Sequence, residues 1–144
     1  MSGFAVNQNG GWVSADSPQE LPSGYTWSAV RPSEAEAPAP NLIAARRYVA
    51  ETSGIVVGGQ KINTGRDSQA LITGAIVSAL VDPSYVCRWK TPSGFVSFDA
   101  ETLKAIGTAV RKHIQDCFDR EDALLQAVAD GTYTTDMLDE GWPV

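Results

Sequence analysis

Apolar positions in the last third of the chain recur at intervals of three and four residues. They are Leu103, Ile106, Val110, Ile114, Cys117, Leu124 and Val128. This spacing puts them on one face of an α-helix. Asp99 supplies a side-chain acceptor for the helix start, and Gly131 is a residue type that ends helices readily. The pattern therefore predicts one long helix from about residue 100 to residue 130.

Two shorter helices are predicted earlier in the chain. Residues 41–52 carry apolar side chains at helical spacing, and Asn41 is the expected N-cap. The second helix runs to residue 81. At its start, Thr64 followed by Asp67 resembles a capping box with Asp in place of Glu. An Asp-Pro pair directly after residue 81 stops this helix, because proline cannot continue it.

Two β-hairpins separate the predicted helices. Gly58 and Gly59 allow the tight turn of the first hairpin, because glycine adopts positive φ at little cost. The second hairpin turns at Pro92-Ser93-Gly94. The predicted strands are residues 55–57, 60–62, 85–90 and 95–98.

The N-terminal region has short apolar and aromatic runs separated by turn signals. Asn9-Gly10-Gly11 marks one turn and residues 22–24 mark another, so three short strands are predicted. A sheet this small buries too little apolar surface to be more than marginally stable alone. The proline-containing sequence RPSEAEAPAP at residues 31–40 then predicts an extended, semi-rigid linker.

The predicted fold class is therefore α+β. A small N-terminal β element and a proline-rich linker precede a domain of the order helix–hairpin–helix–hairpin–long helix. The predicted parts are the β element at 1–30, the linker at 31–40, the α+β domain at 41–131 and a C-terminal tail at 132–144.

The second half of the long helix is the first predicted partner-binding region. Some thirty helical residues span roughly 45 Å at ~1.5 Å each, whereas a domain of about 100 residues has a radius of gyration near 13 Å. We therefore expect Leu124, Leu125 and Val128 to extend into solvent unless a second copy or another protein covers them. The alternative is that the helix breaks within the charged run 119–122 and folds back.

The C-terminal tail is the second predicted partner-binding region. It sets Met137, Leu138 and Trp142 among acidic residues, and a single helical turn starting near Thr135 is expected there. Aromatic anchors dominate interface energetics, so the tail has the composition of a docking peptide. The alternative is that it is a frayed terminus.

The charge balance changes which partners are plausible. The chain has 144 residues and a formal net charge of −6, and an acidic surface repels nucleic-acid backbones, so no nucleic-acid partner is predicted. The longest apolar run is too short and too polar for a bilayer, and the N-terminus lacks a signal-peptide pattern, so no membrane partner is predicted. Two cysteines, Cys87 and Cys117, are too few for a disulfide scaffold and are expected to be free thiols.

Residues for catalysis or metal binding are sparse. His113 lies four residues before Cys117 on one helix face, but zinc would need two further ligands. A core-edge histidine and a buried thiol are the favoured interpretation. No catalytic residue, cofactor site or metal site is predicted, and the protein is expected not to be an enzyme.

Trp12 and Trp27 either stack on a sugar ring or form the core of the N-terminal β element.

The stretch from Arg47 to about Val128 resembles a domain family of unassigned function found in tailed bacteriophages and prophages. Three segments carry the resemblance: RYVAETSGIVVGGQKINTGRDSQALITGA, RWKTPSGFVSFDA and AVRKHIQDCFDRE. Members of that family occur near tail-fibre genes and are often described as tail-fibre assembly or tail proteins. The family has no catalytic motif to transfer to this chain.

The resemblance implies a non-enzymatic phage tail protein, either an adaptor of the virion or an assembly chaperone of the tail fibres. The expected partners are a tail-fibre or baseplate protein and a second copy of the chain, contacted through the long helix. The expected location is the host cytoplasm during assembly, with the virion tail as the location of an adaptor. The alternative hypothesis is a small carbohydrate-binding module of the tail that uses Trp12 and Trp27.

Overall fold

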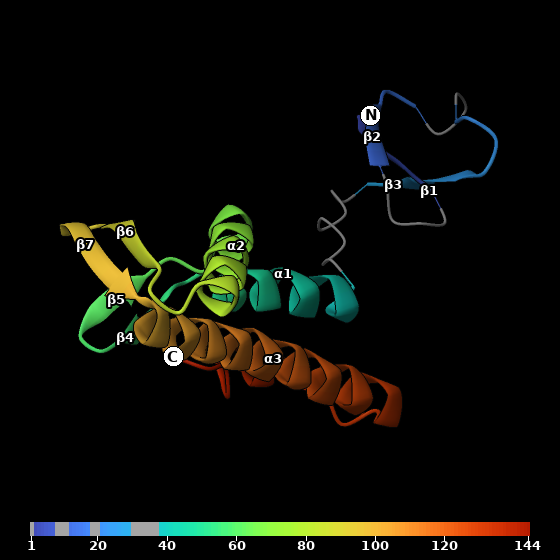
Figure 1. Ribbon diagram of the computed structural model, residues 1–144. Helices are drawn as coiled ribbons and strands as arrows, with labels where there is room; N and C mark the ends of the chain where they lie inside the picture. The colour runs from blue at the N-terminus through green and yellow to red at the C-terminus, as the bar shows by residue number, and fades with distance from the viewer. Residues whose placement is uncertain (1, 8–11, 18–20, 30–37) are drawn as a thin grey trace. The chain divides into compact units, whose positions relative to one another are not determined.

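A computed structural model describes residues 2–7, 12–17, 21–29 and 38–144. The chain forms two compact units, residues 1–38 and residues 39–144, which are described separately. Figure 1 shows strands in the first unit and helices with hairpins in the second unit, and the predicted α+β class and the long C-terminal helix are confirmed.

The first unit is a three-stranded antiparallel sheet. Its strands are β1 (Gly3–Asn7), β2 (Trp12–Ala15) and β3 (Tyr25–Ser28), in the order β2-β1-β3. The three predicted strands are therefore present. The predicted turn at residues 9–11, and residues 31–37 of the predicted linker, lie outside the described residues.

The second unit follows the predicted order of elements. They are α1 (Ala39–Glu51), β4 (Ile55–Val57), β5 (Gln60–Ile62), α2 (Arg66–Val81), β6 (Val86–Thr91), β7 (Gly94–Asp99), α3 (Ala100–Asp130) and the short 3-10 helix η1 (Thr135–Asp139). The hairpins β4–β5 and β6–β7 are each antiparallel pairs. The Asp99 carboxylate accepts a hydrogen bond of 2.8 Å from the Thr102 amide, and Gly131 ends α3 at φ 74°. The predicted cap and stop of the long helix are thus confirmed, and α3 is unbroken across residues 119–122.

Two predicted helix starts are wrong. Helix α1 begins at Ala39, so Asn41 lies inside its first turn and is not the N-cap. Pro40 is tolerated there because the first amides of a helix need no intrahelical acceptor. At α2 the N-cap residue is Gly65, without a side-chain cap. The Thr64 hydroxyl instead donates to the Glu51 carbonyl oxygen at 2.6 Å and accepts from the Gly54 amide at 2.9 Å.

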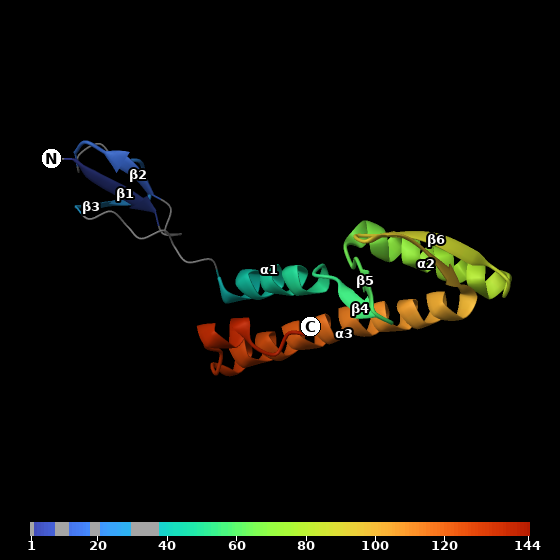
Figure 2. The same ribbon diagram turned by 90° about the vertical axis from the view of Figure 1, so that its left-hand side faces the viewer.

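Helices α1 and α2 of the second unit both pack against α3. Helix α2 lies along the first half of α3 and α1 along its second half (Figure 2). Gly107 permits the close approach of α2, because an added Cβ would come within 2.0 Å of the Ile76 Cδ1 atom. The hydrophobic core lies between α2, α3 and the two hairpins, and its fully buried side chains include Ile62 and Leu103.

Candidate functional site

A groove lies between the start of α2 and the β6–β7 hairpin. Its volume is about 510 Å³. The lining residues are Asn63, Ser68, Leu71, Cys87, Arg88, Trp89, Lys90, Thr91, Pro92 and Phe95. The two walls come from segments separated in sequence, so the groove exists only once the hairpin and α2 are both in place.

Apolar and aromatic side chains give the groove its binding surface. Leu71 is 64% exposed and Phe95 is 63% exposed, so both side chains present apolar surface to a ligand. The Arg88 guanidinium lies over the Phe95 ring at 5.4 Å from its centroid. This cation–π contact orients both side chains on the outer surface of the hairpin.

The turn of the hairpin is fixed by its own hydrogen bonds. The Thr91 hydroxyl donates to the Gly94 carbonyl oxygen at 2.9 Å, and Gly94 has φ 125°, which a side chain would disfavour. The predicted turn at residues 92–94 is therefore present, with Gly94 already paired to Thr91 in the strand ladder. This turn holds Pro92 at the mouth of the groove.

The groove has the opposite charge to the protein as a whole. Its lining contains Arg88 and Lys90 and no aspartate or glutamate, although the chain carries a formal net charge of −6. The lining also contains no histidine. Its donors and apolar surface can bind an acidic, partly apolar ligand.

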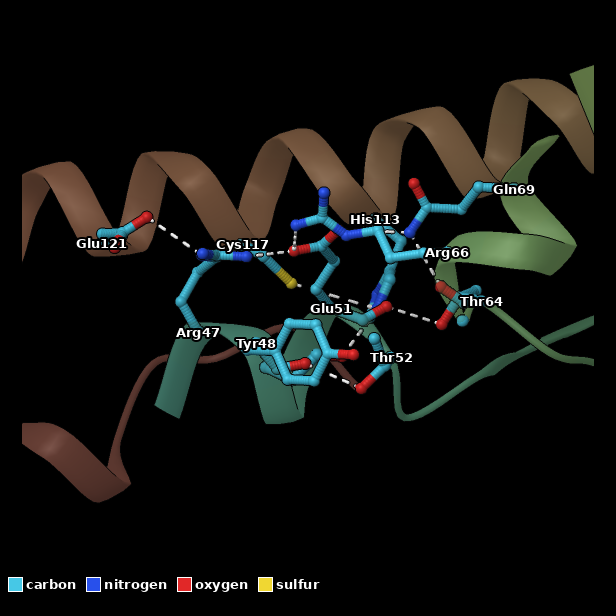
Figure 3. A network of polar contacts seen from close by, with 12 residues as sticks. Arg47, Tyr48, Glu51, Thr52, Thr64, Arg66, Gln69, His113, Cys117 and Glu121 are labelled. Carbon is cyan, nitrogen blue, oxygen red and sulfur yellow. Dashed lines mark hydrogen bonds and ion pairs between the residues drawn. The ribbon is translucent and has the colours of Figure 1, made fainter. Parts of the chain in front are cut away.

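A buried carboxylate holds the α2 wall of the groove in place. Glu51, at the end of α1, is 1% exposed. It forms ion pairs with Arg47 and with Arg66, the latter at 2.9 Å, and accepts a hydrogen bond of 3.2 Å from the Gln69 side-chain amide. Figure 3 shows these groups converging on the Glu51 side chain beside α3. Gln69 also donates to the Thr64 carbonyl oxygen at 2.8 Å, which fixes the segment between β5 and α2.

The electrostatics of Glu51 follow from these partners. Burial acts to raise the pKa of its carboxyl group, but the hydrogen bonds from Gln69 and Arg47 and the charges of Arg66 and Arg47 outweigh burial, so the pKa is lowered. Arg47 also donates to Glu121 on α3 at 3.0 Å. The network therefore ties α1, α2 and α3 together and has a structural role.

His113 and Cys117 occupy the interior beside this network. Both are buried, as the favoured interpretation of the sequence predicted. His113 Nε2 lies 3.0 Å from the Ala50 carbonyl oxygen, and the Cys117 sulfur lies 3.9 Å from His113 Nε2. Burial, followed by the charges of Glu51 and Asp116, raises the pKa of Cys117 to about 11, so it is a poor nucleophile. Both cysteines are free thiols. Within the described residues, no group of three potential ligands gathers around a metal position.

The last turns of α3 are more covered than the sequence predicted. The expectation that Leu124 extends into solvent is wrong, because Leu124 is 0% exposed. Val128 is half-buried, and Leu125 is 36% exposed. The cause is helix α1, which lies along this half of α3 and contributes the Arg47–Glu121 ion pair (Figure 2). Of these three predicted partner-binding residues, only Leu125 is presented to solvent.

The C-terminal tail folds back onto its own domain. Met137 and Leu138 are half-buried in η1, whose N-cap is Thr134, one residue before the predicted start. The Trp142 indole donates to the Leu138 carbonyl oxygen at 2.7 Å, and Arg46 of α1 lies 5.4 Å from the Trp142 ring centroid. The tail's anchor residues are therefore engaged within the chain.

Trp12 and Trp27 lie on opposite faces of the N-terminal sheet. Trp12 pairs with Val6, whereas Trp27 pairs with Ala5, and neighbouring residues of a strand point to opposite faces. Trp12 packs edge-on against Phe4 with the ring centroids 5.2 Å apart. The two indoles consequently cannot stack on the same sugar ring.

Sequence reasoning did not find the groove. Its strongest local signal is Trp89 between the charged residues Arg88 and Lys90, followed by Phe95 directly after the turn. The sequence does not show that this hairpin and Leu71 of α2 line one groove, because that proximity depends on tertiary packing.

Comparison with known proteins places the chain in a family. Residues 34–140 match the domain family described as Domain of unknown function (DUF4376), and the protein belongs to this family. The matched span contains the whole stretch from Arg47 to Val128 on which the sequence resemblance rests. No curated protein and no solved structure matches the chain. In the part of the chain that the structure describes, no helix is both long and apolar enough to cross a membrane.

Proposed function

We propose that the protein is a non-enzymatic bacteriophage tail protein that binds a tail-fibre protein, as an assembly chaperone or as a virion adaptor. The observation that carries the proposal is the groove between α2 and the β6–β7 hairpin. The assignment to phage tails rests on the sequence resemblance. The DUF4376 family description itself assigns no activity.

The chemistry of the groove specifies the segment that it would bind. Leu71, Trp89 and Phe95 provide apolar and aromatic contact area of the kind that dominates interface energetics. Arg88 and Lys90 add two positive charges on a protein that is otherwise acidic. The complementary ligand is an extended segment with apolar anchors flanked by aspartate or glutamate, and we assign that segment to the tail-fibre protein.

The two-unit organisation supports a bridging role. The second unit carries the groove, and the small β sheet of the first unit is a separate compact unit. A baseplate protein is the partner that we assign to the first unit in the adaptor form of the proposal. Analysis of purified mature virions separates the two forms, since an adaptor remains in the particle and a chaperone does not.

Calorimetric titration of the full-length protein with the tail-fibre protein of the same genome tests the proposal. We expect saturable binding that the Phe95→Ser variant weakens at least tenfold, about 1.4 kcal/mol. Val56→Ser is the matched control, because Val56 is 69% exposed on β4 and does not line the groove. Absence of binding to the fibre, or equal binding by both variants, would reject the groove as the fibre site.

A further inference from the structure

Helix α2 is apolar on the side that faces solvent. Its buried residues are Ile72, Ala75 and Ala79, which pack on the core. At 100° per residue, Arg66 in the first turn and the polar Thr73 also lie on the side diametrically opposite, which otherwise carries Ala70, Gly74, Val77 and Val81. All four of these residues are exposed, and Val81 is 82% exposed. An exposed helix face normally carries polar and charged side chains along its whole length.

Large side chains widen this outer face. Leu71 borders it on one side and Leu80 on the other, at 64% and 66% exposure. Beyond Arg66 and Asp67 in its first turn the face carries no charge, because the helix contains no charged residue between Asp67 and Asp82. In a chain with 28 charged residues, 11 basic and 17 acidic, an uncharged run of this length is unusual for a solvated helix face.

We infer that the outer face of α2 is a self-association surface, on which a second copy of the chain docks about a two-fold axis. An isologous interface brings identical patches together. On an acidic protein, most surfaces would then oppose like charges, whereas the α2 face opposes none. This uncharged, self-complementary face favours a second copy over a charged partner.

The length of α2 sets the register of the pair. The helix has 16 residues, so its midpoint lies between Thr73 and Gly74, and a Cβ added at Gly74 would meet no atom within 4 Å. Antiparallel packing about Gly74 sets Val77 of one copy between Ala70 and Gly74 of the other. It also sets Arg66, whose side chain is 56% exposed, beside Asp82 of the second copy. Opposite charges therefore meet at both ends of the apolar contact.

The size of the face predicts a dimer of moderate affinity. A helix of this length is about 24 Å long and about 10 Å wide, and two such faces with their flanking side chains bury on the order of 1,000 Å² in total, the lower limit of specific interfaces. We therefore expect a dissociation constant in the micromolar range. This interface differs from a contact through the long helix α3, whose apolar stripe is occupied by α1 and α2.

Sedimentation velocity of the full-length protein across the micromolar range tests the inference. We expect reversible dimerisation of the 15.3 kDa chain, and the Val77→Glu variant should weaken it at least tenfold while keeping the wild-type circular dichroism spectrum. Val56→Glu, at a site 69% exposed on β4, is the control and should dimerise normally. A protein that remains monomeric throughout the range overturns the inference, as does a dimer that Val77→Glu leaves intact.

A second variant keeps the test valid if Val77→Glu fails to fold. Gly74→Leu has room in the monomer and replaces glycine by a strong helix former, so the monomer should be at least as stable as wild type. The same side chain obstructs the close approach of two helices, so dimerisation should weaken. The Gly74→Cys variant in a Cys87→Ser background should form an intermolecular disulfide on mild oxidation, because the residue lies on the axis. Failure of this cross-link overturns the proposed register and with it the proposed interface.

Discussion

The Arg120 guanidinium of α3 donates a hydrogen bond of 3.0 Å to the main-chain carbonyl oxygen of Glu140 in the C-terminal tail. A second hydrogen bond, of 2.9 Å, runs from Arg120 to the Met137 carbonyl oxygen. Gly141 follows directly, and an added Cβ there would come within 2.9 Å of the Arg120 side chain. The tail is therefore held on the second half of α3 by one arginine, where the sequence had suggested a free docking peptide.

Replacing Arg120 by alanine is expected to release the tail. Two charge-assisted hydrogen bonds are lost, which should destabilise the docked tail by roughly 1–3 kcal/mol. Hydrogen–deuterium exchange should then be faster in residues 135–142 and unchanged in the core of α3. Arg111→Ala is the control, since Arg111 is an exposed arginine of the same helix. Unchanged exchange in the tail of the Arg120→Ala variant would contradict its anchoring role.

Replacing Glu51 by alanine is expected to destabilise the whole second unit. Arg47, whose side chain is only 14% exposed, would lose its closest carboxylate and remain partly buried. Removing one member of a buried ion pair typically costs about 3–5 kcal/mol. We expect about 3 kcal/mol, because Arg66 is 56% exposed and can be rehydrated. Urea denaturation gives the free energy of unfolding.

The control for the Glu51 variant is Glu101→Ala. Glu101 pairs with Lys104 at the surface, where its side chain is 87% exposed. Exposed pairs of this kind contribute about 0–1 kcal/mol. Equal losses of stability in the two variants would show that the Glu51 network does not hold the three helices together as the structure indicates.

Glu51 also makes the free energy of unfolding depend on pH in the acidic range. Its pKa is lowered in the folded state from the ordinary value of 4.5, so the unfolded chain takes up a proton at a higher pH than the folded chain does. The contribution of Glu51 is fully present above the ordinary value and is lost as the pH falls through the lowered pKa. Thermal melts between neutral pH and pH ~3 should show a steeper acid decline for wild type than for Glu51→Gln. Parallel declines would exclude this linkage.

Cys117 makes the free energy of unfolding depend on pH in the alkaline range, with a sign opposite to that of Glu51. The pKa of Cys117 is raised to about 11 from 9.0, so the unfolded chain ionises first and stability falls as the pH rises through this interval.

A thiol reagent such as DTNB should react promptly with the half-buried Cys87 and react with Cys117 only on unfolding. The Cys87→Ser variant should therefore show one slow thiol in the native state. Rapid labelling of that variant would mean that Cys117 is accessible.

Local signals in the sequence were sufficient for most of the fold. Asp99 and Gly131 bound α3 as predicted because capping depends on the few residues next to a helix end. Thr64 was assigned a capping role that it does not have, because its hydroxyl is engaged by Glu51 and Gly54 across the fold. Leu124 was expected in solvent because its burial depends on the packing of α1, which no local pattern encodes.

The candidate site was less accessible to sequence reasoning. The sequence contains an uncharged run between Asp67 and Asp82. Such a run predicts an ordinary buried helix, whereas the structure shows that one side of this helix is exposed. The groove requires Leu71 and Phe95 to line the same hollow, and this arrangement arises from the placement of the hairpin relative to α2. Residues that are distant in sequence therefore define the groove, whereas the outer face of α2 comes from one helix and depends on the rest of the fold leaving it exposed.

Hydrogen–deuterium exchange of the protein with and without the tail-fibre protein tests the central claim most directly. The claim is that the groove between α2 and the β6–β7 hairpin contacts the fibre. It predicts that bound fibre slows exchange in residues 63–71 and 86–95, and that the Phe95→Ser variant loses this protection. Protection confined to residues 124–142, or no protection anywhere in the second unit, would contradict it.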